Sequence, residues 1–190
     1  MDIVSKQEKQ KMHPHKFTLW VAIGSLIMMF AGLTSAFIVK SNQDKWIPVA
    51  LPMIFWISTG MILLSSLTMQ LSLRSFKDRE MSKYRFLIGV TVVLGAAFII
   101  CQWLGFQQLW EQKVTFKGSG GGQFLYVIFG LHALHVVGGL IVLLIMFIKG
   151  FLGKTKNYSS VPVEVAATYW HFVDALWIYL LVFFLVLGKN

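Results

Sequence analysis

The sequence predicts an all-α integral membrane protein, a bundle of five transmembrane helices. Its mean hydropathy is +0.68, and 56% of its 190 residues are hydrophobic whereas only 13% are charged. A soluble domain of this size needs considerably more polar surface. The apolar residues fall into five long uncharged runs, and about 20 such residues are enough for one crossing. The length and continuity of these runs exclude the short alternating strands of a membrane β-barrel.

The five expected spans lie at about residues 17–39, 46–73, 86–110, 123–148 and 165–187. Because the connections between them are short and polar, residues 1–190 are expected to form a single membrane domain. The first run lacks a small-residue cleavage pattern, so we keep it as a span. Pro48 and Pro52 fall at the start of the second run, where a first helical turn tolerates proline. The stretch 118–122, Gly-Ser-Gly-Gly-Gly, is expected to be a flexible turn.

The basic residues indicate how the chain is oriented in the membrane. Twelve of the 17 Lys and Arg residues lie in the amino terminus, the connection after the second span and the connection after the fourth span. Because cytoplasmic segments carry the excess of Lys and Arg, we expect a cytoplasmic amino terminus and an external carboxyl terminus. The formal net charge of +9 is attributed to this topology and to anionic lipid, so no nucleic-acid partner is expected.

Five ionisable side chains interrupt or border the last two apolar runs. His132 and His135 are three residues apart and share one helix face, as do His171 and Asp174, while Glu164 stands at the cytoplasmic lip of the fifth span. At about 1.5 Å per residue, His135 and Asp174 fall at nearly the same depth. Polar groups at this depth face protein or water rather than lipid. We therefore expect Asp174 to accept a hydrogen bond from an imidazole, and all five residues to form a structural polar cluster joining the two spans.

Small residues predict where helices approach one another closely. Gly130, Gly138 and Gly139 flank the two histidines of the fourth span, and Gly32 belongs to a set of small residues in the first span. The Ser and Thr side chains of the second span are expected to bond to carbonyls of their own helix. Cys101 is the single cysteine, so it cannot form an internal disulfide and is expected to be inert.

Residue chemistry leaves three functions open for the polar side chains. They can hold the fourth and fifth spans together, they can line a proton or ion path, or His135 and His171 can ligate a haem from two helices. Trp170, Phe172 and Trp177 leave little room for a macrocycle. The sequence also shows neither the broken helices nor the inverted halves typical of transporters. The structural function is therefore favoured, with no catalytic or metal-binding residue.

Two of these stretches resemble subunit III of the haem–copper cytochrome c oxidases. Residues 130–139, GLHALHVVGG, are similar to the family pattern G-x-H-G-x-H-V-x-x-G. Residues 169–177, with Glu164 upstream, are similar to the family pattern Y-W-H-F-V-D-x-x-W. Weaker similarity occurs at residues 30–36, FAGLTSA, and 102–106, QWLGF. Family members have seven spans or a shorter form with five, and this chain resembles the short form.

The resemblance implies an accessory subunit without haem or copper of its own, both of which belong to partner subunits. The implied partners are the catalytic subunit I, subunit II of the same complex and bound phospholipid. The resemblance also allows membership of a respiratory supercomplex. The implied role is support of assembly, turnover stability and proton uptake during aerobic respiration, in a bacterial inner (plasma) membrane. A quinol oxidase subunit III carries the same motifs, so the electron donor stays open. A stand-alone b-type haem protein and a small transporter are the alternatives from other classes.

The chain departs from the family pattern at two positions. Leu26 stands where family members commonly carry a buried Glu in the corresponding span, a few residues before F-A-G-L. Any function that depends on that carboxylate is in question. Ala133 replaces the second Gly of G-x-H-G, a small-for-small change that helix packing should tolerate.

Overall fold

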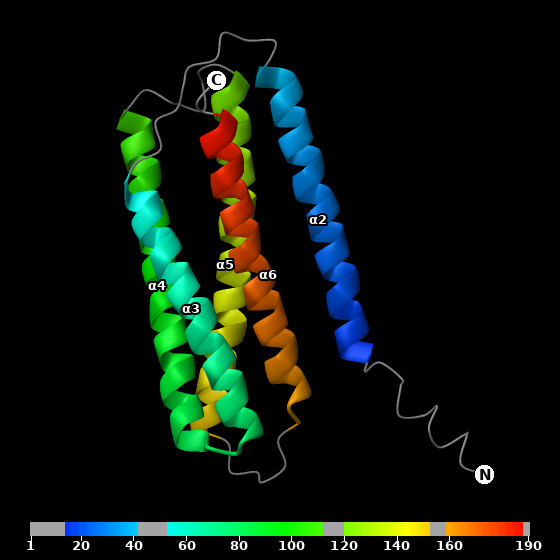
Figure 1. Ribbon diagram of the computed structural model, residues 1–190, viewed down its shortest axis with the longest axis vertical. Helices are drawn as coiled ribbons and strands as arrows, with labels where there is room; N and C mark the ends of the chain where they lie inside the picture. Colours follow the sequence, from blue (N-terminus) through cyan, green and yellow to red (C-terminus); the bar gives the residue numbers. More distant parts are fainter. Residues whose placement is uncertain (1–13, 42–52, 112–119, 153–158, 188–190) are drawn as a thin grey trace, which may run out of the picture.

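The described part of the chain is an up-and-down bundle of long helices. The computed structural model describes residues 14–41, 53–111, 120–152 and 159–187. The helices are α2 (Pro14–Ser41), α3 (Ile54–Lys77), α4 (Met81–Glu111), α5 (Gly120–Leu152) and α6 (Val161–Leu187). Each is long and apolar enough to cross a membrane, which confirms the predicted all-α bundle of five transmembrane helices. Helices α2, α4 and α6 begin at the end of the bundle where α3 and α5 finish (Figure 1).

The helices extend beyond the uncharged runs that predicted them. Helix α3 ends at Lys77 rather than near residue 73, α4 begins at Met81 rather than near 86, and α6 begins at Val161 rather than near 165. Charged residues mark the edge of the hydrocarbon, but the backbone stays helical through the headgroup layer because long basic side chains reach outward to water. The predicted start of the second span, residues 46–52, lies outside the described residues.

The glycine-rich stretch differs from the expected flexible turn. Residues 120–122 form the first turn of α5, whereas Gly118 and Ser119 lie outside the described residues. Glycine disfavours a helix by about 1 kcal/mol relative to alanine. The long apolar run that follows supplies the cooperative hydrogen bonding that extends the helix through these glycines.

Helices α5 and α6 occupy the middle of the bundle, between α2 on one side and the α3–α4 pair on the other (Figure 1). Helix α6 contacts α2, α3 and α5, and α4 contacts α3 and α5. Among the described helices, α2 contacts only α5 and α6. A tight turn at residues 78–80 joins α3 to α4, and Arg79 adopts a φ of 63° there. The backbone of α6 therefore lies beside α2, α3 and α5, and its tryptophan side chains also reach α4.

The core of the bundle is built largely from aromatic rings. Phe129 of α5 stacks on Phe55 of α3 with ring centroids 6.0 Å apart, and on Phe184 of α6 at 4.9 Å. Phe98 of α4 packs edge-on against Trp177 of α6 at 5.3 Å. Such pairs add roughly 0.5–1.5 kcal/mol each beyond area burial. They hold the helices together by van der Waals packing, which is one of the forces that drive helix association in lipid.

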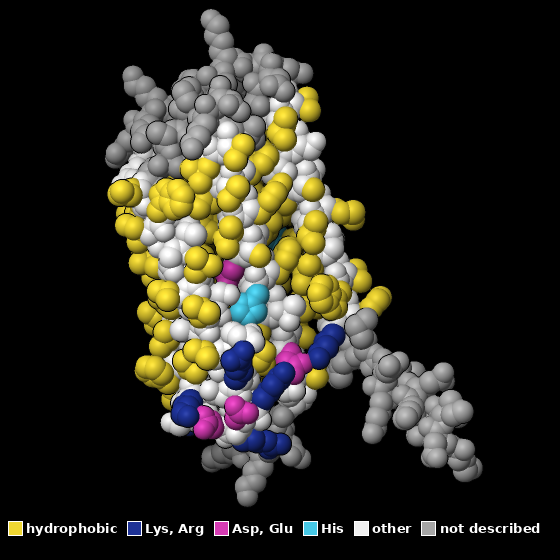
Figure 2. Space-filling view, viewed as in Figure 1, with side chains coloured by type: hydrophobic (Ala, Val, Ile, Leu, Met, Phe, Trp, Pro, Cys, Tyr) yellow, Lys and Arg dark blue, Asp and Glu magenta, His cyan; other side chains and the backbone are white. Residues whose placement is uncertain are grey.

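In the part of the chain that the structure describes, the sides of the bundle are apolar and most of the charge lies at one end. Large side chains such as Trp20, Trp56 and Trp103 are mostly exposed. Figure 2 shows hydrophobic side chains over much of the visible face, with most of the visible Lys, Arg, Asp and Glu at the end where α2 begins and α3 finishes, and acidic surface also beside a histidine nearer the middle. This distribution fits a protein whose sides face hydrocarbon and whose ends face water.

Candidate functional site: polar contacts around helix α6

His171 of α6 is bonded to α3. Its Nδ1 atom lies 2.6 Å from Oγ of Ser66, and its Nε2 atom lies 3.2 Å from Oε1 of Gln70. An amide oxygen only accepts, so Nε2 donates to Gln70 and Nδ1 accepts from the Ser66 hydroxyl. Both ring nitrogens are thus engaged, and the imidazole ties α6 to α3.

Two indole rings of α6 bond to the same face of α3. Nε1 of Trp170 donates to Oγ of Ser65 at 3.1 Å, and Nε1 of Trp177 donates to Oγ1 of Thr59 at 3.0 Å. The Thr59 hydroxyl itself donates to the carbonyl of Phe55 at 2.7 Å, as expected for the hydroxyls of the second span. A hydroxyl oxygen has a lone pair left to accept from the indole, so bonding within its own helix does not prevent bonding between helices.

Sequence reasoning missed Trp170 and Trp177 as polar contacts, because it treated them only as bulk. The signal was available in their spacing. The two tryptophans are seven residues apart, and so are the buried side chains of Ser58, Ser65 and Ser72 on α3. A seven-residue repeat keeps one helix face against its neighbour, so matched repeats on two helices predict a shared seam.

Asp174 lies one turn beyond His171 and is only 3% exposed. Neither of its carboxyl oxygens has a hydrogen-bond partner among the described residues, although the Ser66 side chain lies beside it. The expected hydrogen bond from an imidazole to Asp174 is therefore not formed within the described part of the chain, since His171 bonds to α3 instead. A carboxyl group in such a place is costly when charged.

His135 of α5 bonds within its own helix. Its Nδ1 atom lies 2.7 Å from the carbonyl oxygen of Leu131. The hydrogen bond that joins α5 to α6 in this region instead comes from the Tyr169 hydroxyl, which donates to the backbone carbonyl of His135 at 3.2 Å. The α5–α6 contact near His135 thus uses the backbone of this residue rather than its ring.

His132 is the most deeply buried of the predicted site residues. It is 2% exposed, and neither ring nitrogen has a hydrogen-bond partner among the described residues. Aromatic rings surround it, with centroids at 5.5 Å for Trp177 and 6.5 Å for both Phe30 and Phe98. The ring of His132 therefore contacts α2, α4 and α6 without a hydrogen bond to any of them.

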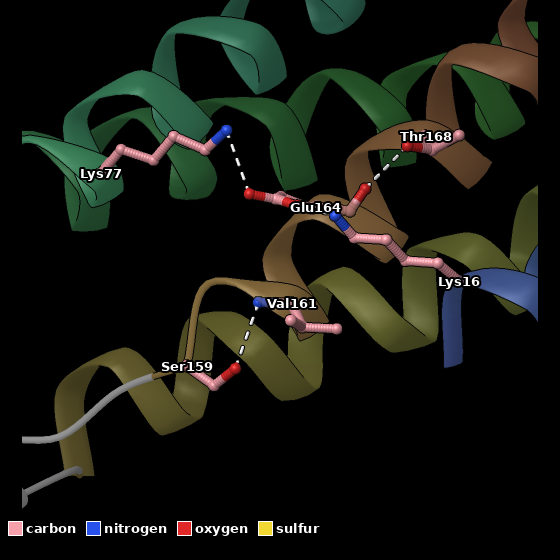
Figure 3. A network of polar contacts seen from close by, with 6 residues as sticks. All are labelled: Lys16, Lys77, Ser159, Val161, Glu164 and Thr168. Carbon is pink, nitrogen blue, oxygen red and sulfur yellow. Dashed lines mark hydrogen bonds and ion pairs between the residues drawn. The ribbon is translucent and has the colours of Figure 1, made fainter. Parts of the chain in front are cut away.

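Glu164 joins three helices at the charged end of the bundle (Figure 3). Its carboxylate lies 2.6 Å from Nζ of Lys16 on α2 and 3.0 Å from Nζ of Lys77 on α3. Its backbone carbonyl accepts from the Thr168 hydroxyl at 2.8 Å. Because Glu164 lies in the first turn of α6, the helix dipole also favours its negative charge.

Among the described residues, only one of the four glycines predicted to serve close packing is tightly enclosed. A Cβ built on Gly139 would meet the rings of Trp170 and Tyr169, both at 3.1 Å. A Cβ built on Gly32, Gly130 or Gly138 would meet nothing within 4 Å. The closest approaches that the sequence did not predict are at Gly89, Gly95 and Gly105 of α4.

The five predicted residues therefore lie around α6 as separate contacts. Within the described ranges, no hydrogen bond or ion pair joins any two of them; His171 bonds to α3, and Glu164 pairs with α2 and α3. The difference arises because α6 has three neighbouring helices, of which α3 offers a row of hydroxyl and amide groups. In the same part of the chain, no three His, Cys, Asp or Glu side chains are grouped so that they could hold a metal ion. Chemically, the arrangement is suited to fixing helices relative to one another.

The chain is similar to known proteins over nearly its whole length. The family model described as cytochrome c oxidase subunit III matches residues 6–189. Cytochrome c oxidase subunit 3 of Bacillus sp. (strain PS3) is 26% identical over 174 residues, covering 89% of this chain and 84% of the relative. The protein of the same name from Alkalihalophilus pseudofirmus is 29% identical over 194 residues, covering 93% and 92%. Probable cytochrome c oxidase subunit 3 of Nocardia farcinica is 28% identical over 185 residues, covering 89% of each chain. With its five apolar helices and a match across nearly its whole length, this chain belongs to the cytochrome c oxidase subunit III family.

Proposed function

We propose that this chain is the accessory, non-redox subunit III of a haem–copper terminal oxidase that works in aerobic respiration. The observation that carries the proposal is the family match over residues 6–189, which includes every described helix. The names of the relatives favour cytochrome c rather than a quinol as the electron donor of the complex. Haem and copper are assigned to subunits I and II, with subunit I as the direct partner.

The surroundings of the histidines support a non-redox role. A bis-histidine haem needs one free ring nitrogen from each of two histidines. Both nitrogens of His171 are taken by Ser66 and Gln70. His132 is enclosed by aromatic rings rather than facing a space between two histidines. The bonds from α6 to its neighbours are better suited to keeping this subunit rigid while it supports assembly and sustained turnover.

The charge distribution supports a cytoplasmic amino terminus in a bacterial plasma membrane. Lys16, Lys77 and Lys149 lie near the starts or ends of three different helices at the same end of the bundle. Basic residues favour the cytoplasmic side of a bacterial inner membrane. The relatives compared are bacterial proteins as well.

The bundle also offers a place for phospholipid. A cavity of about 580 Å³ lies between α2, α5 and α6, with mostly apolar walls that include Ala22, Val142 and Val165. At the same end, Lys16 and Lys77 share the single carboxylate of Glu164, which leaves a net positive charge near the expected headgroup layer. An acyl chain in the cavity with an anionic headgroup near this end fits both features.

The proposal is tested by purifying the chain with an affinity tag from its native membrane in mild detergent. We expect subunits I and II to co-purify, with haem in the complex and no stoichiometric haem band from the separated chain. Deleting the chain should leave early oxygen reduction but shorten the period over which the oxidase keeps turning over. A haem band from the isolated chain, or full transport activity without any oxidase subunit, would overturn the proposal.

A further inference from the structure

The side of α6 that faces away from the bundle carries a row of polar side chains. Glu164, Thr168 and His171 are four and three residues apart, so they lie on one helix face, and none of them is fully buried. Ser66 and Gln70, on the adjoining edge of α3, are partly exposed as well. This outward surface of the two helices, the α3–α6 face, is therefore not purely apolar.

Gln70 and His171 lie well inside the hydrocarbon layer. Lys77 and Glu164 form an ion pair at the charged end of the bundle, which marks the level of the headgroups. Gln70 lies seven residues before Lys77, and His171 lies seven residues after Glu164. At about 1.5 Å per residue, both are about 10 Å further into a hydrocarbon core that is about 30 Å thick. The hydrogen bond from Nε2 of His171 to Oε1 of Gln70 is thus formed at a depth that bulk water does not reach.

The amide group of Gln70 is only half used by this hydrogen bond. Its oxygen accepts from His171, while its nitrogen carries two N–H donors. Among the described residues no acceptor pairs with this nitrogen, and unlike the oxygens of Asp174 it is not enclosed by the bundle. An amide without a partner is costly in an apolar medium, and lipid tails offer no acceptor. The nitrogen of Gln70 therefore requires an acceptor from outside the described bundle.

The surroundings of Gln70 fit a helix of another protein. Leu67 and Leu63, about one and two turns away on α3, are 62% and 46% exposed. Ala175, one turn beyond His171 on α6, is also exposed and is small enough to let a neighbouring backbone approach closely. Helices associate in lipid through such packing together with hydrogen bonds from polar side chains. One donor surrounded by apolar and small side chains is therefore complementary to a single helix that carries one acceptor.

We propose that the α3–α6 face is the surface through which this chain binds the catalytic, haem-bearing subunit of the oxidase. One transmembrane helix of that subunit packs on Leu63, Leu67 and Ala175, and an oxygen of a Ser, Thr, Asn or Gln side chain on it accepts from the amide nitrogen of Gln70. The acceptor is uncharged because an ionised carboxylate is too costly at this depth opposite a neutral amide. The identity of the partner rests on the proposed function, whereas the position of the interface rests on the surface of α3 and α6.

Site-specific photocross-linking in the native membrane tests the interface. A photoreactive diazirine side chain is placed at Leu67 or Ala175 of the full chain. Val93 and Ile100 of α4, which are 68% and 60% exposed, serve as matched control positions. We expect Leu67 and Ala175 to cross-link to the haem-bearing subunit, and the control positions to cross-link mainly to lipid. Cross-links from Leu67 and Ala175 to lipid alone, or to a second copy of this chain, would overturn the proposal.

Two kinds of variant separate loss of the interface from loss of the fold. Leu67→Trp adds bulk at an outward position, so it should fold normally and still speed dissociation of the chain from the purified oxidase, whereas Val93→Trp on α4 should not. Gln70→Leu removes the donor and should raise the dissociation rate about three- to fifteenfold, as expected for one hydrogen bond between membrane helices. Gln108→Leu is its control, because Gln108 is exposed near the end of α4 where water reaches its amide. Unchanged dissociation rates for both Leu67→Trp and Gln70→Leu would contradict the interface.

Failure of this interface and failure of the proposed function give different results. If the haem-bearing subunit co-purifies with the chain but cross-links only to the α4 positions, the proposed function stands and the α3–α6 interface is wrong. If no haem-bearing subunit co-purifies, the proposed function fails and the interface fails with it.

Discussion

The Ser66 hydroxyl of α3 lies 2.6 Å from Nδ1 of His171 on α6. His171 thus bonds to α3, whereas the sequence predicted a polar cluster that joins α6 to the histidines of α5. The Ser66–His171 hydrogen bond belongs to a row of contacts that also includes the Trp170–Ser65 and Trp177–Thr59 hydrogen bonds. The bonds of Trp170 and His171, from one turn of α6, and that of Trp177, about two turns further on, make this seam a principal polar connection to α3 within the described bundle.

Ser66→Ala should destabilise the bundle by roughly 0.6–1.7 kcal/mol, the range found for hydrogen bonds between membrane helices. The substitution leaves Nδ1 of His171 without its donor. Unfolding by SDS from mild detergent micelles measures the change. A double-mutant cycle with His171→Leu should give a coupling of similar size, since the two side chains contact each other directly. Ser25→Ala is the control, because Ser25 is exposed and bonds only to the Ala22 carbonyl in its own helix. A coupling energy of zero would contradict a direct contact between Ser66 and His171.

Gly139→Val should destabilise the α5–α6 contact by roughly 1–3 kcal/mol, as overpacking does in a filled core. The added carbons meet the rings of Trp170 and Tyr169, and Trp170 is held by its hydrogen bond to Ser65. Gly138→Val is a control one residue away that meets nothing within 4 Å. Thermal unfolding of the two variants in the same detergent compares them. Equal melting temperatures would mean that Gly139 is no closer to α6 than Gly138 is.

Glu164→Gln should loosen the charged end of the bundle, because it breaks the ion pairs to Lys16 and Lys77 together. The expected loss is at most about 1 kcal/mol, since the lysines are substantially exposed and such pairs are screened by water. The difference from the unchanged chain should shrink as salt is raised. Amide hydrogen exchange at the first turn of α6 gives a local measurement.

Glu80→Gln is the matched control for the Glu164 prediction. Glu80 pairs with Lys83 three residues away within one short segment, at 2.8 Å and with both side chains exposed. Its loss should change exchange only at the start of α4. If Glu80→Gln loosened α6 as much as Glu164→Gln, the effect would be one of net charge rather than of a contact between helices.

Asp174→Asn should leave the bundle folded and the oxidase assembled. The carboxyl group has no hydrogen-bond partner among the described residues, so the neutral isostere loses no bond and removes the cost of a buried charge. Initial oxygen reduction by the purified complex should equal that of the unchanged protein. An immediate loss of that activity in a fully assembled complex would assign Asp174 to the chemistry of the oxidase and contradict the structural role given to α6.

Much of the architecture could be predicted from the sequence. The number of helices, the end at which the basic residues gather and the family all depend on local signals: the length of each apolar run, the positions of Lys and Arg, and two short motifs. These signals are local because the hydrocarbon core of a membrane requires each span to be apolar and helical, whichever helices lie beside it. For the same reason, the sequence predicted that His132, His135, His171 and Asp174 face protein rather than lipid, without indicating which residues they contact.

The partners were decided by the tertiary structure alone. His171 and Asp174 share a face of α6, but which helix that face meets depends on how α6 is rotated between α2, α3 and α5. Gly138 and Gly139 are equally small, yet only Gly139 lies under an indole ring. Helix rotation and register are set by the combined packing of Phe, Trp and Gly side chains across all the interfaces, and no single stretch of the sequence contains that information.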